Sequence, residues 1–362
     1  MRILGPVLFG LIVLEVLLRL YNPLPFRVRG DRIVLPVNQS YRFTNTGSKK
    51  LDAVTYHTKN SLGFRGPEPP ADWSSRLTIL TIGGSTTECL FLSDGKTWTD
   101  ELAKRVAAVR PDAWVNNAGL DGQSTFGHLI LLRDFVSTLR PRVAVFLIGI
   151  NDVGRGDPTG FDVALLPQSA GRLHHAATWI SERSTVAALA QNLLRVVRTH
   201  RAGFGHFEID MHYPPRGLID EPEMERILNE RARRHLDGYR DRVRQIVASS
   251  RAMNVQAVLV TQPALYGGTI DPTSGVDLTV ADVDGTTNGI LAWRILELFN
   301  DVTREVGRET GTPVIDLARE MPKDSRYFYD YLHFTNEGAV RVGDIVFAGL
   351  EAHLPPPRRP PD

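Results

Sequence analysis

Four short blocks of this sequence carry the kinds of side chain that a reactive serine needs. A serine hydroxyl attacks an ester only when a base accepts its proton, a further group orients that base, and donors stabilise the oxyanion that forms. The blocks supply a serine after two glycines, a glycine-rich turn, an asparagine, and a histidine three residues after an aspartate. They read Gly83-Gly-Ser-Thr-Thr87, Asn117-Ala-Gly-Leu-Asp-Gly122, Gly149-Ile-Asn-Asp152 and Asp330-Tyr-Leu-His333. Their combination indicates ester chemistry through an acyl-serine intermediate.

Taken singly, each block has an ordinary structural explanation. A Gly-Gly-Ser after a strand is most often a tight turn, an Asn-Asp pair is usually a turn or a helix cap, and most histidines are not catalytic. Other reactive-site schemes fit the chain less well. The nucleophile elbow of α/β hydrolases requires Gly-x-Ser-x-Gly, whereas Thr87 occupies the last position. No P-loop string follows the strand that precedes the serine.

Neither a metal nor an organic cofactor is expected. Five histidines outside the blocks lack the cysteines or the His-Glu-x-x-His spacing of a zinc site. They are His174, His175, His200, His206 and His212. The single cysteine, Cys89, excludes an intrachain disulfide and is expected to be a buried spectator.

The blocks resemble those of the SGNH hydrolases, also called GDSL-type esterases. The resemblance implies that Ser85 is the nucleophile, that His333 is its base and that Asp330 orients this histidine. It also implies that the N–H groups of Ser85 and Gly122, with the side-chain amide of Asn151, form the oxyanion hole. The usual Gly-Asp-Ser-Leu is replaced by Gly-Ser-Thr-Thr, a departure that affects no catalytic group.

This resemblance covers roughly Leu77 to Leu350 and implies an α/β fold with a three-layer, doubly wound parallel sheet of the flavodoxin-like type. The residue pattern agrees, because Val143 to Gly149 is a continuous apolar run of the kind that a strand buried on both faces needs. Ligands of such sheets bind outside the carboxyl ends of the strands, where three of the blocks fall. Helices are expected over 97–109, 184–197, 228–246, 290–306 and 338–350, and further strands over 77–82, 114–116, 257–261 and 314–316.

The N-terminal segment from Ile3 to Leu20 is almost wholly apolar and just long enough to cross a bilayer. Its two charges, Glu15 and Arg19, have the spacing of a helical ion pair. A cleaved signal peptide is the alternative, but no small-x-small cleavage site follows the segment. We therefore expect an uncleaved transmembrane anchor.

The side of the membrane is predicted by two opposing signals. The arginines after the segment outnumber Arg2 before it, and by the positive-inside rule they favour a cytoplasmic catalytic domain. Anchored bacterial members of the resembled family commonly face outward, and we follow that resemblance. The expected location is the cell membrane, with a single pass and an extracytoplasmic catalytic domain.

The expected organisation has four parts and two insertions. The insertions should lie at the catalytic edge, where Trp179, Tyr213 and Tyr266 would form a sugar platform or an acyl pocket. The aspartates of the second insertion lack the pattern of a calcium loop. Within the extension, Asn60 to Gly66 resembles a segment found before the nucleophile in anchored members, and we expect a loop or short hairpin there. The parts are an anchor (1–22), a linker and extension (23–73), the hydrolase domain (74–354, with insertions at about 153–221 and 266–287) and a disordered proline-rich tail (355–362).

The composition of the chain argues against nucleic acid as a binding partner. The formal net charge of the 362 residues is +1, from 42 basic and 41 acidic residues, and no basic stretch is interleaved with aromatics, so nucleic acid is not an expected partner. The sequence predicts a serine esterase that cleaves an acyl or acetyl ester of a carbohydrate or lipid. Two alternatives stay open. One is an O-acyltransferase acting on a cell-surface polysaccharide, and the other is a catalytically silent binding protein on the same fold.

Overall fold

The computed structural model describes residues 4–21, 26–45, 48–158, 162, 171–201 and 217–356. The chain forms two compact units, the first made of Met1–Pro36 with Pro158–Gly205 and the second of Val37–Asp157 with His206–Asp362. All four blocks lie in the second unit. The helices of the first insertion group with the N-terminal helix, whereas the sequence-based boundaries, which stay predictions, place them in the hydrolase domain. The expected tail falls, from residue 357 onward, outside the described residues.

The second unit is built on a five-stranded parallel sheet with strand order β6-β5-β7-β8-β9. Numbered along the chain, this order is 2-1-3-4-5, which is that of flavodoxin-like doubly wound sheets. Every residue of β5 and β7 is buried, as the continuous apolar run of β7 predicts for that strand. The predicted α/β fold with a parallel sheet is confirmed. The strands are β5 (Leu77–Gly83), β6 (Ala113–Asn117), β7 (Val143–Ile148), β8 (Gln256–Thr261) and β9 (Val314–Ile315).

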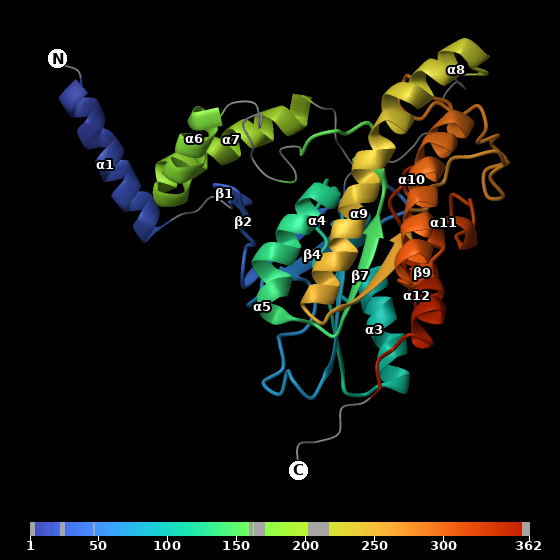
Figure 1. The fold of residues 1–362 in the computed structure, drawn as a ribbon, viewed down its shortest axis with the longest axis horizontal. Coiled ribbons are helices and arrows are strands. Elements are labelled where there is room, and N and C mark those ends of the chain that lie inside the picture. The colour runs from blue at the N-terminus through green and yellow to red at the C-terminus, as the bar shows by residue number, and fades with distance from the viewer. Residues whose placement is uncertain are drawn as a thin grey trace. The chain divides into compact units, whose positions relative to one another are not determined.

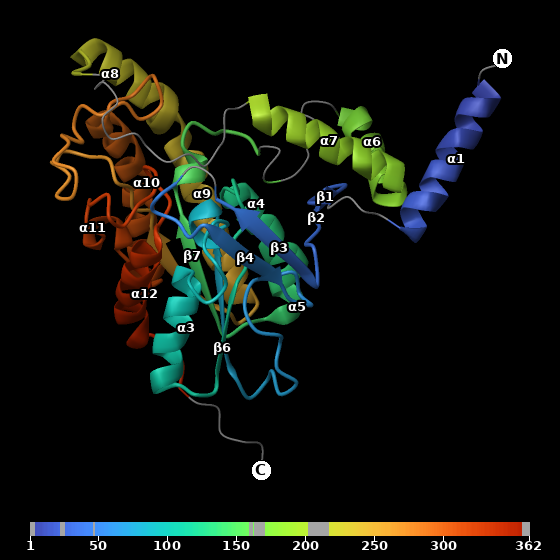
Figure 2. The ribbon, with the colours of Figure 1, turned by 180° about the vertical axis from the view of Figure 1, so that it is seen from behind.

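Helices cover both faces of this sheet. Helices α3 and α12 pack together on one face, and α4, α9 and α10 pack side by side on the other (Figures 1 and 2). The helical pattern predicted over 228–246 is present, but a π-helical turn, η4, interrupts it. The helices of this unit are α2 (Ser85–Glu88), α3 (Trp98–Val109), α4 (Thr125–Leu131), η1 (Leu132–Val136), α5 (Ser137–Leu139), η2 (Ile150–Asp152), α8 (Glu221–Leu228), η4 (Asn229–Arg233), α9 (Arg234–Ala252), α10 (Gly289–Thr310), α11 (Leu317–Glu320) and α12 (Asn336–Glu351).

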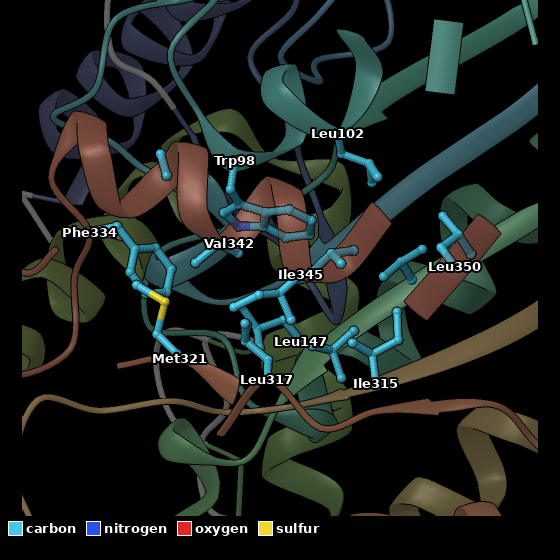
Figure 3. Close-up of a cluster of buried hydrophobic side chains, with 14 of the residues drawn as sticks. Trp98, Leu102, Leu147, Ile315, Leu317, Met321, Phe334, Val342, Ile345 and Leu350 are labelled. Atoms are coloured by element: carbon cyan, nitrogen blue, oxygen red, sulfur yellow. The ribbon is translucent and has the colours of Figure 1, made fainter. Parts of the chain in front are cut away.

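The core beneath α3 and α12 connects these helices to the segment that follows Ser85. Trp98, Leu102 and Ile345 come from the two helices and are buried side by side with residues of the sheet (Figure 3). Thr97 caps α3 with a reciprocal capping box, as its position in the sequence predicts. The indole N–H of Trp98 donates to the carbonyl of Thr86 at 3.0 Å. The start of α3 therefore fixes the turn of chain that follows Ser85.

The extension before the sheet forms an antiparallel hairpin of β3 (Gln39–Thr44) and β4 (Val54–Lys59) (Figure 2). The chain then makes a tight turn through Asn60 to Gly66. The backbone N–H and carbonyl of Arg65 pair with those of Asn117 in both directions at 2.9 Å. This bridge attaches the extension to the end of β6, an edge strand of the parallel sheet.

The first unit contains α1 (Leu4–Leu20), α6 (Gly171–Arg183), α7 (Thr185–Arg201) and a small hairpin of β1 (Val28–Arg29) and β2 (Arg32–Ile33). The predicted ion pair between Glu15 and Arg19 is present at 2.7 Å. The carboxylate of Glu15 also accepts the N–H groups of Thr185 and Val186, at 2.9 and 3.0 Å, and so caps α7.

The sequence-based expectation of a transmembrane anchor over Ile3 to Leu20 is not supported. Among the described residues, no helix has both the length and the apolar character needed to cross a membrane.

Candidate active site

The first and fourth blocks meet in a continuous chain of hydrogen bonds. Ser85 is the first residue of α2, directly after β5 and Gly84. The Nε2 atom of His333 lies 2.7 Å from Oγ of Ser85, and Nδ1 of the same ring lies 2.6 Å from a carboxylate oxygen of Asp330. Because the carboxylate accepts the proton on Nδ1, Nε2 is left to accept the serine proton. These contacts are those a nucleophile and its oriented base require.

The turn that carries Asp330 and His333 is rigid. One oxygen of Asp330 accepts the N–H groups of Leu332 and His333 at 2.8 and 2.7 Å, and the ring of Tyr329 stacks on that of His333. Burial alone would raise the pKa of Asp330. The charge of His333 and the hydrogen bonds from its ring and from the two N–H groups outweigh burial and hold that pKa below its usual value. Asp330 is therefore ionised when His333 takes up a proton.

The second block forms a loop against α2. Gln123 donates its N–H to the carbonyl of Leu120 at 3.1 Å, and the turn between them places Gly122 at φ 69°, a conformation that glycine adopts without steric cost. A Cβ atom on Gly119 would lie 2.3 Å from the backbone nitrogen of Glu88. The backbone of this loop is therefore in direct contact with the backbone of α2. Within the described part of the chain, no hydrogen bond uses the N–H of Ser85 or of Gly122.

The third block brings Asn151 to the same place. Asn151 lies in η2 just after β7, and its side-chain nitrogen donates to the carbonyl of Gln123 at 2.9 Å. A Cβ atom on Gly84 would lie 2.1 Å from that nitrogen. The amide of Asn151 therefore lies beside the residue before the nucleophile. All five sequence-predicted site residues belong to segments that are joined by direct contacts, although their catalytic roles stay predictions.

A buried ion pair between Asp152 and Arg242 stabilises this arrangement. Asp152, 1% exposed, receives a hydrogen bond from Arg242 of α9 at 3.1 Å and further ones from both the backbone N–H and the hydroxyl of Thr125 at the start of α4. Arg242 also donates to the hydroxyl of Thr125 at 2.7 Å and covers the ring of Phe126. The network joins η2, which carries Asn151, to the helix that follows Gly122. Sequence reasoning missed it, because nothing in the spacing of Arg242 distinguishes it from the other arginines of its helix.

The space beside the serine is small. A hollow of about 10 Å³, room for roughly one water molecule, is bounded by Ser85, His333 and mainly apolar side chains. Cys89 is one of these, and burial raises the pKa of its thiol to about 12. The thiol donates to the carbonyl of Thr86, which agrees with the spectator role expected from the sequence. The other lining residues are Thr86, Phe91, Leu92, Tyr329 and Phe334.

Of the three aromatic residues expected to form a platform at this site, the structure tests only Tyr266. Tyr266 is only 3% exposed and packs in a core with Leu296, so the prediction that it presents its ring to a substrate is wrong. Tyr266 is buried because its loop folds back between α10 and the turn that carries Asp330. In that turn, the carbonyl of Tyr331 accepts the N–H of Leu265. Trp179 belongs to the first unit, and Tyr213 lies outside the described residues. In the parts of the chain that are described, no group of His, Cys, Asp and Glu could hold a metal ion.

Two solved structures are among those similar to the chain. The acetylxylan esterase Axe2 of Geobacillus stearothermophilus is similar at 15% identity over 76% of this chain and 94% of its own, with a TM-score of 0.44. A putative GDSL-like lipase from Parabacteroides merdae is similar at 14% identity over 79% of this chain and 98% of its own, also with a TM-score of 0.44. No curated protein sequence matches the chain significantly.

The family comparison is more specific. Residues 81–341, more than half of the chain, match the GDSL-like Lipase/Acylhydrolase family. This range contains all four blocks, and it leaves out both the N-terminal helix and the β3–β4 hairpin. The chain belongs to the GDSL-like lipase/acylhydrolase family and is an ester-hydrolysing enzyme.

Proposed function

We propose that Ser85 is the nucleophile of a serine esterase that hydrolyses an acyl or acetyl ester of a carbohydrate or lipid. The observation that carries the proposal is the chain of hydrogen bonds from Asp330 through His333 to Ser85, with lengths of 2.6 and 2.7 Å. Chance packing seldom produces a buried carboxylate, an imidazole and a hydroxyl in this order and at these distances.

The geometry supports a two-step reaction. His333 takes the proton of the Ser85 hydroxyl as the oxygen attacks the ester carbonyl, and the N–H groups of Ser85 and Gly122 with the amide of Asn151 stabilise the oxyanion. The tetrahedral intermediate expels the alcohol, which receives the proton from His333. A water molecule then attacks the acyl-serine with His333 again as base, and the carboxylic acid leaves. Asp330 stabilises the imidazolium in both steps.

The test begins with a fluorophosphonate probe, which labels only an activated serine. The wild-type enzyme should be labelled at Ser85 and should hydrolyse p-nitrophenyl acetate, and Ser85→Ala should lose both properties. A wild-type enzyme that is neither labelled nor active would indicate the silent binding protein instead. Rates with acetyl, butyryl and octanoyl esters and with acetylated glycans then identify the acyl group and the alcohol.

Transfer of the acyl group to a sugar hydroxyl uses the same residues, because only the second nucleophile differs. Product analysis distinguishes the two reactions. Incubation with an acetyl donor and a soluble oligosaccharide yields free acetate from a hydrolase and an acetylated sugar from a transferase. Accumulation of the acetylated sugar would replace the hydrolase assignment with the O-acyltransferase.

We also propose that α1 attaches the enzyme to the cell membrane, with the catalytic unit on the outer side. The support is the exposure of apolar side chains around the helix, which no soluble surface favours. Full-length protein should stay with membranes through a carbonate wash, and protease added to spheroplasts should digest the catalytic unit. Complete protection would place the catalytic unit inside the cell. The exposed residues are Val7, Leu8, Phe9, Leu11, Ile12, Val13, Leu14, Val16, Leu17 and Leu20.

A further inference from the structure

The extension before the parallel sheet supplies two cations to the reactive centre. Lys59 ends strand β4, and Arg65 lies six residues later in the turn that follows. Both precede residue 81, where the family match begins. Their exposed fractions are 5% and 3%, respectively. A long cation is rarely buried so completely unless paired groups hold it there, so the partners of these side chains indicate what they do.

Arg65 binds the end of the nucleophile helix. Its Nη1 atom donates to the carbonyls of Glu88 and Cys89 at 2.8 and 2.7 Å, and Nη2 donates to the carbonyl of Leu92 at 2.8 Å. Asp94 balances the charge at 2.8 Å. Carbonyls at a helix end have no partner within the helix, and a guanidinium satisfies them while matching the negative end of the helix dipole.

This contact lies at a strained point of the backbone. Cys89 follows α2 with φ 51° and ψ 53°, a left-handed conformation that a residue with a side chain seldom adopts. The Arg65 guanidinium holds the carbonyl of this residue and that of the residue before it. Because α2 has four residues and begins at Ser85, fixing its last carbonyls also fixes the direction of the Ser85 side chain.

Lys59 acts on the loop that carries Gly122 through one intermediate residue, Glu88. Its ammonium lies 3.3 Å from one carboxylate oxygen of Glu88, the last residue of α2. The other oxygen of Glu88 accepts the N–H of Asp121 at 2.6 Å. Asp121 directly precedes Gly122. The Glu88 carboxylate therefore connects helix α2 to the loop that carries Gly122. Lys59 neutralises this carboxylate at a buried position, where a charge without a counter-ion would be costly.

We propose that Arg65 and Lys59 are positioning residues of the catalytic centre, so that the extension is a working part of the enzyme. The assignment rests on the proposed function, because the geometry that they fix is that of Ser85 and Gly122. Neither residue needs to touch a substrate. Displacing a reactive group by about 1 Å can lower a rate by about 100-fold, so loss of either cation should lower kcat and leave KM nearly unchanged.

The experiment compares Arg65→Met with Arg304→Met in the full-length enzyme. Arg304 of α10 is also buried, at 7% exposed, and pairs with Glu297, Asp301 and Asp316. Both changes should lower the melting temperature. Only Arg65→Met should lower kcat, by 10-fold to 100-fold, and slow fluorophosphonate labelling by a similar factor. Equal kcat in the two variants, measured well below both melting temperatures, would overturn the proposal.

A second pair of variants keeps the proposal testable if Arg65→Met does not fold. Lys59→Met removes the ammonium that lies 3.3 Å from the buried carboxylate of Glu88, and should lower kcat at least 10-fold. Adding Glu88→Gln removes that charge but keeps an oxygen for the N–H of Asp121, so most of the lost kcat should return. Failure of Lys59→Met to lower kcat, or of Glu88→Gln to restore it, would show that Lys59 contributes only stability. A wild-type enzyme that is neither labelled nor active would instead overturn the proposed function, and this proposal with it.

Discussion

Gly84→Ala should disable the oxyanion hole without replacing any of the five proposed site residues. The added Cβ atom would lie 2.1 Å from the side-chain nitrogen of Asn151 and 3.1 Å from the carbonyl oxygen of Gln123. Ordinary contact begins near 3.4 Å, so the Asn151 amide must retreat by about 1.3 Å. The amide is the end of a side chain that can rotate, and the fold should therefore survive the change.

The magnitude follows from the proposed role of that amide. Removing one oxyanion donor typically lowers kcat by about 100-fold to 1,000-fold, or roughly 2.7–4 kcal/mol of transition-state stabilisation. The substrate carbonyl carries little charge before attack, so KM should change little. Asn151→Ala should give a loss of the same size. The double variant should be little slower than either single one, because both changes remove the same donor.

Steady-state kinetics with p-nitrophenyl acetate provides the assay, and Gly156→Ala provides the control. A Cβ atom on Gly156 meets nothing closer than 3.7 Å, at the ring of His235, so this variant should retain its kcat. A Gly84→Ala enzyme with wild-type kcat would refute the reasoning. A loss confined to KM would make Asn151 a residue that binds the ground state. Additive losses in the double variant would show that Gly84→Ala acts elsewhere.

Three further predictions concern the catalytic pair, the buried ion pair and the dependence of stability on pH. Ser85→Ala and His333→Ala should each lower kcat by several orders of magnitude, and the double variant should be hardly worse, since the two act as a unit. Arg242→Met removes the cation that pairs with the buried carboxylate of Asp152, so urea unfolding should show a loss of about 3–5 kcal/mol; a loss under 1 kcal/mol would contradict this. Burial, with nearby Arg and Lys charges, lowers the pKa of His57 to about 3. As the pH is lowered from 6.5 to 3, this histidine binds a proton in the unfolded chain but not in the folded chain. The free energy of unfolding should therefore decrease by up to about 1.4 kcal/mol per pH unit. His57→Phe should remove this dependence and the exposed control His353→Phe should not.

The parallel sheet was predictable because its signals are local. A strand buried on both faces must be apolar throughout, and Val143–Ile148 shows that composition without reference to any other segment. The positions of Ser85 and Asn151 followed, since each comes directly after such a strand. Their approach to one another required only the rule that the carboxyl ends of parallel strands meet at one edge.

Predictions that depended on exposure were less successful. Tyr266 lies in a loop rich in glycine and aspartate, and such composition suggested an open surface. The loop is instead held in place by contacts with residues far along the chain, among them Lys323, which donates to the carbonyls of Ala264 and Tyr266. Similarly, the apolar run of α1 gave no sign that its one acidic residue, Glu15, would cap another helix. A composition does not state which distant segment will supply a partner.

The same limit explains why the sequence predicted no role in the site for the extension. Arg65 and Glu88 are 23 residues apart, and the carbonyls that Arg65 binds carry no side-chain signal at all. Four-residue helix α2 is too short to be stable by itself, because a helix of that length has hardly passed the unfavourable step of nucleation. The orientation of Ser85 must therefore come from outside α2. The structure supplies it through the loop at Gly119, the indole of Trp98 and the guanidinium of Arg65, and only the last of these comes from a segment that lies outside the family match.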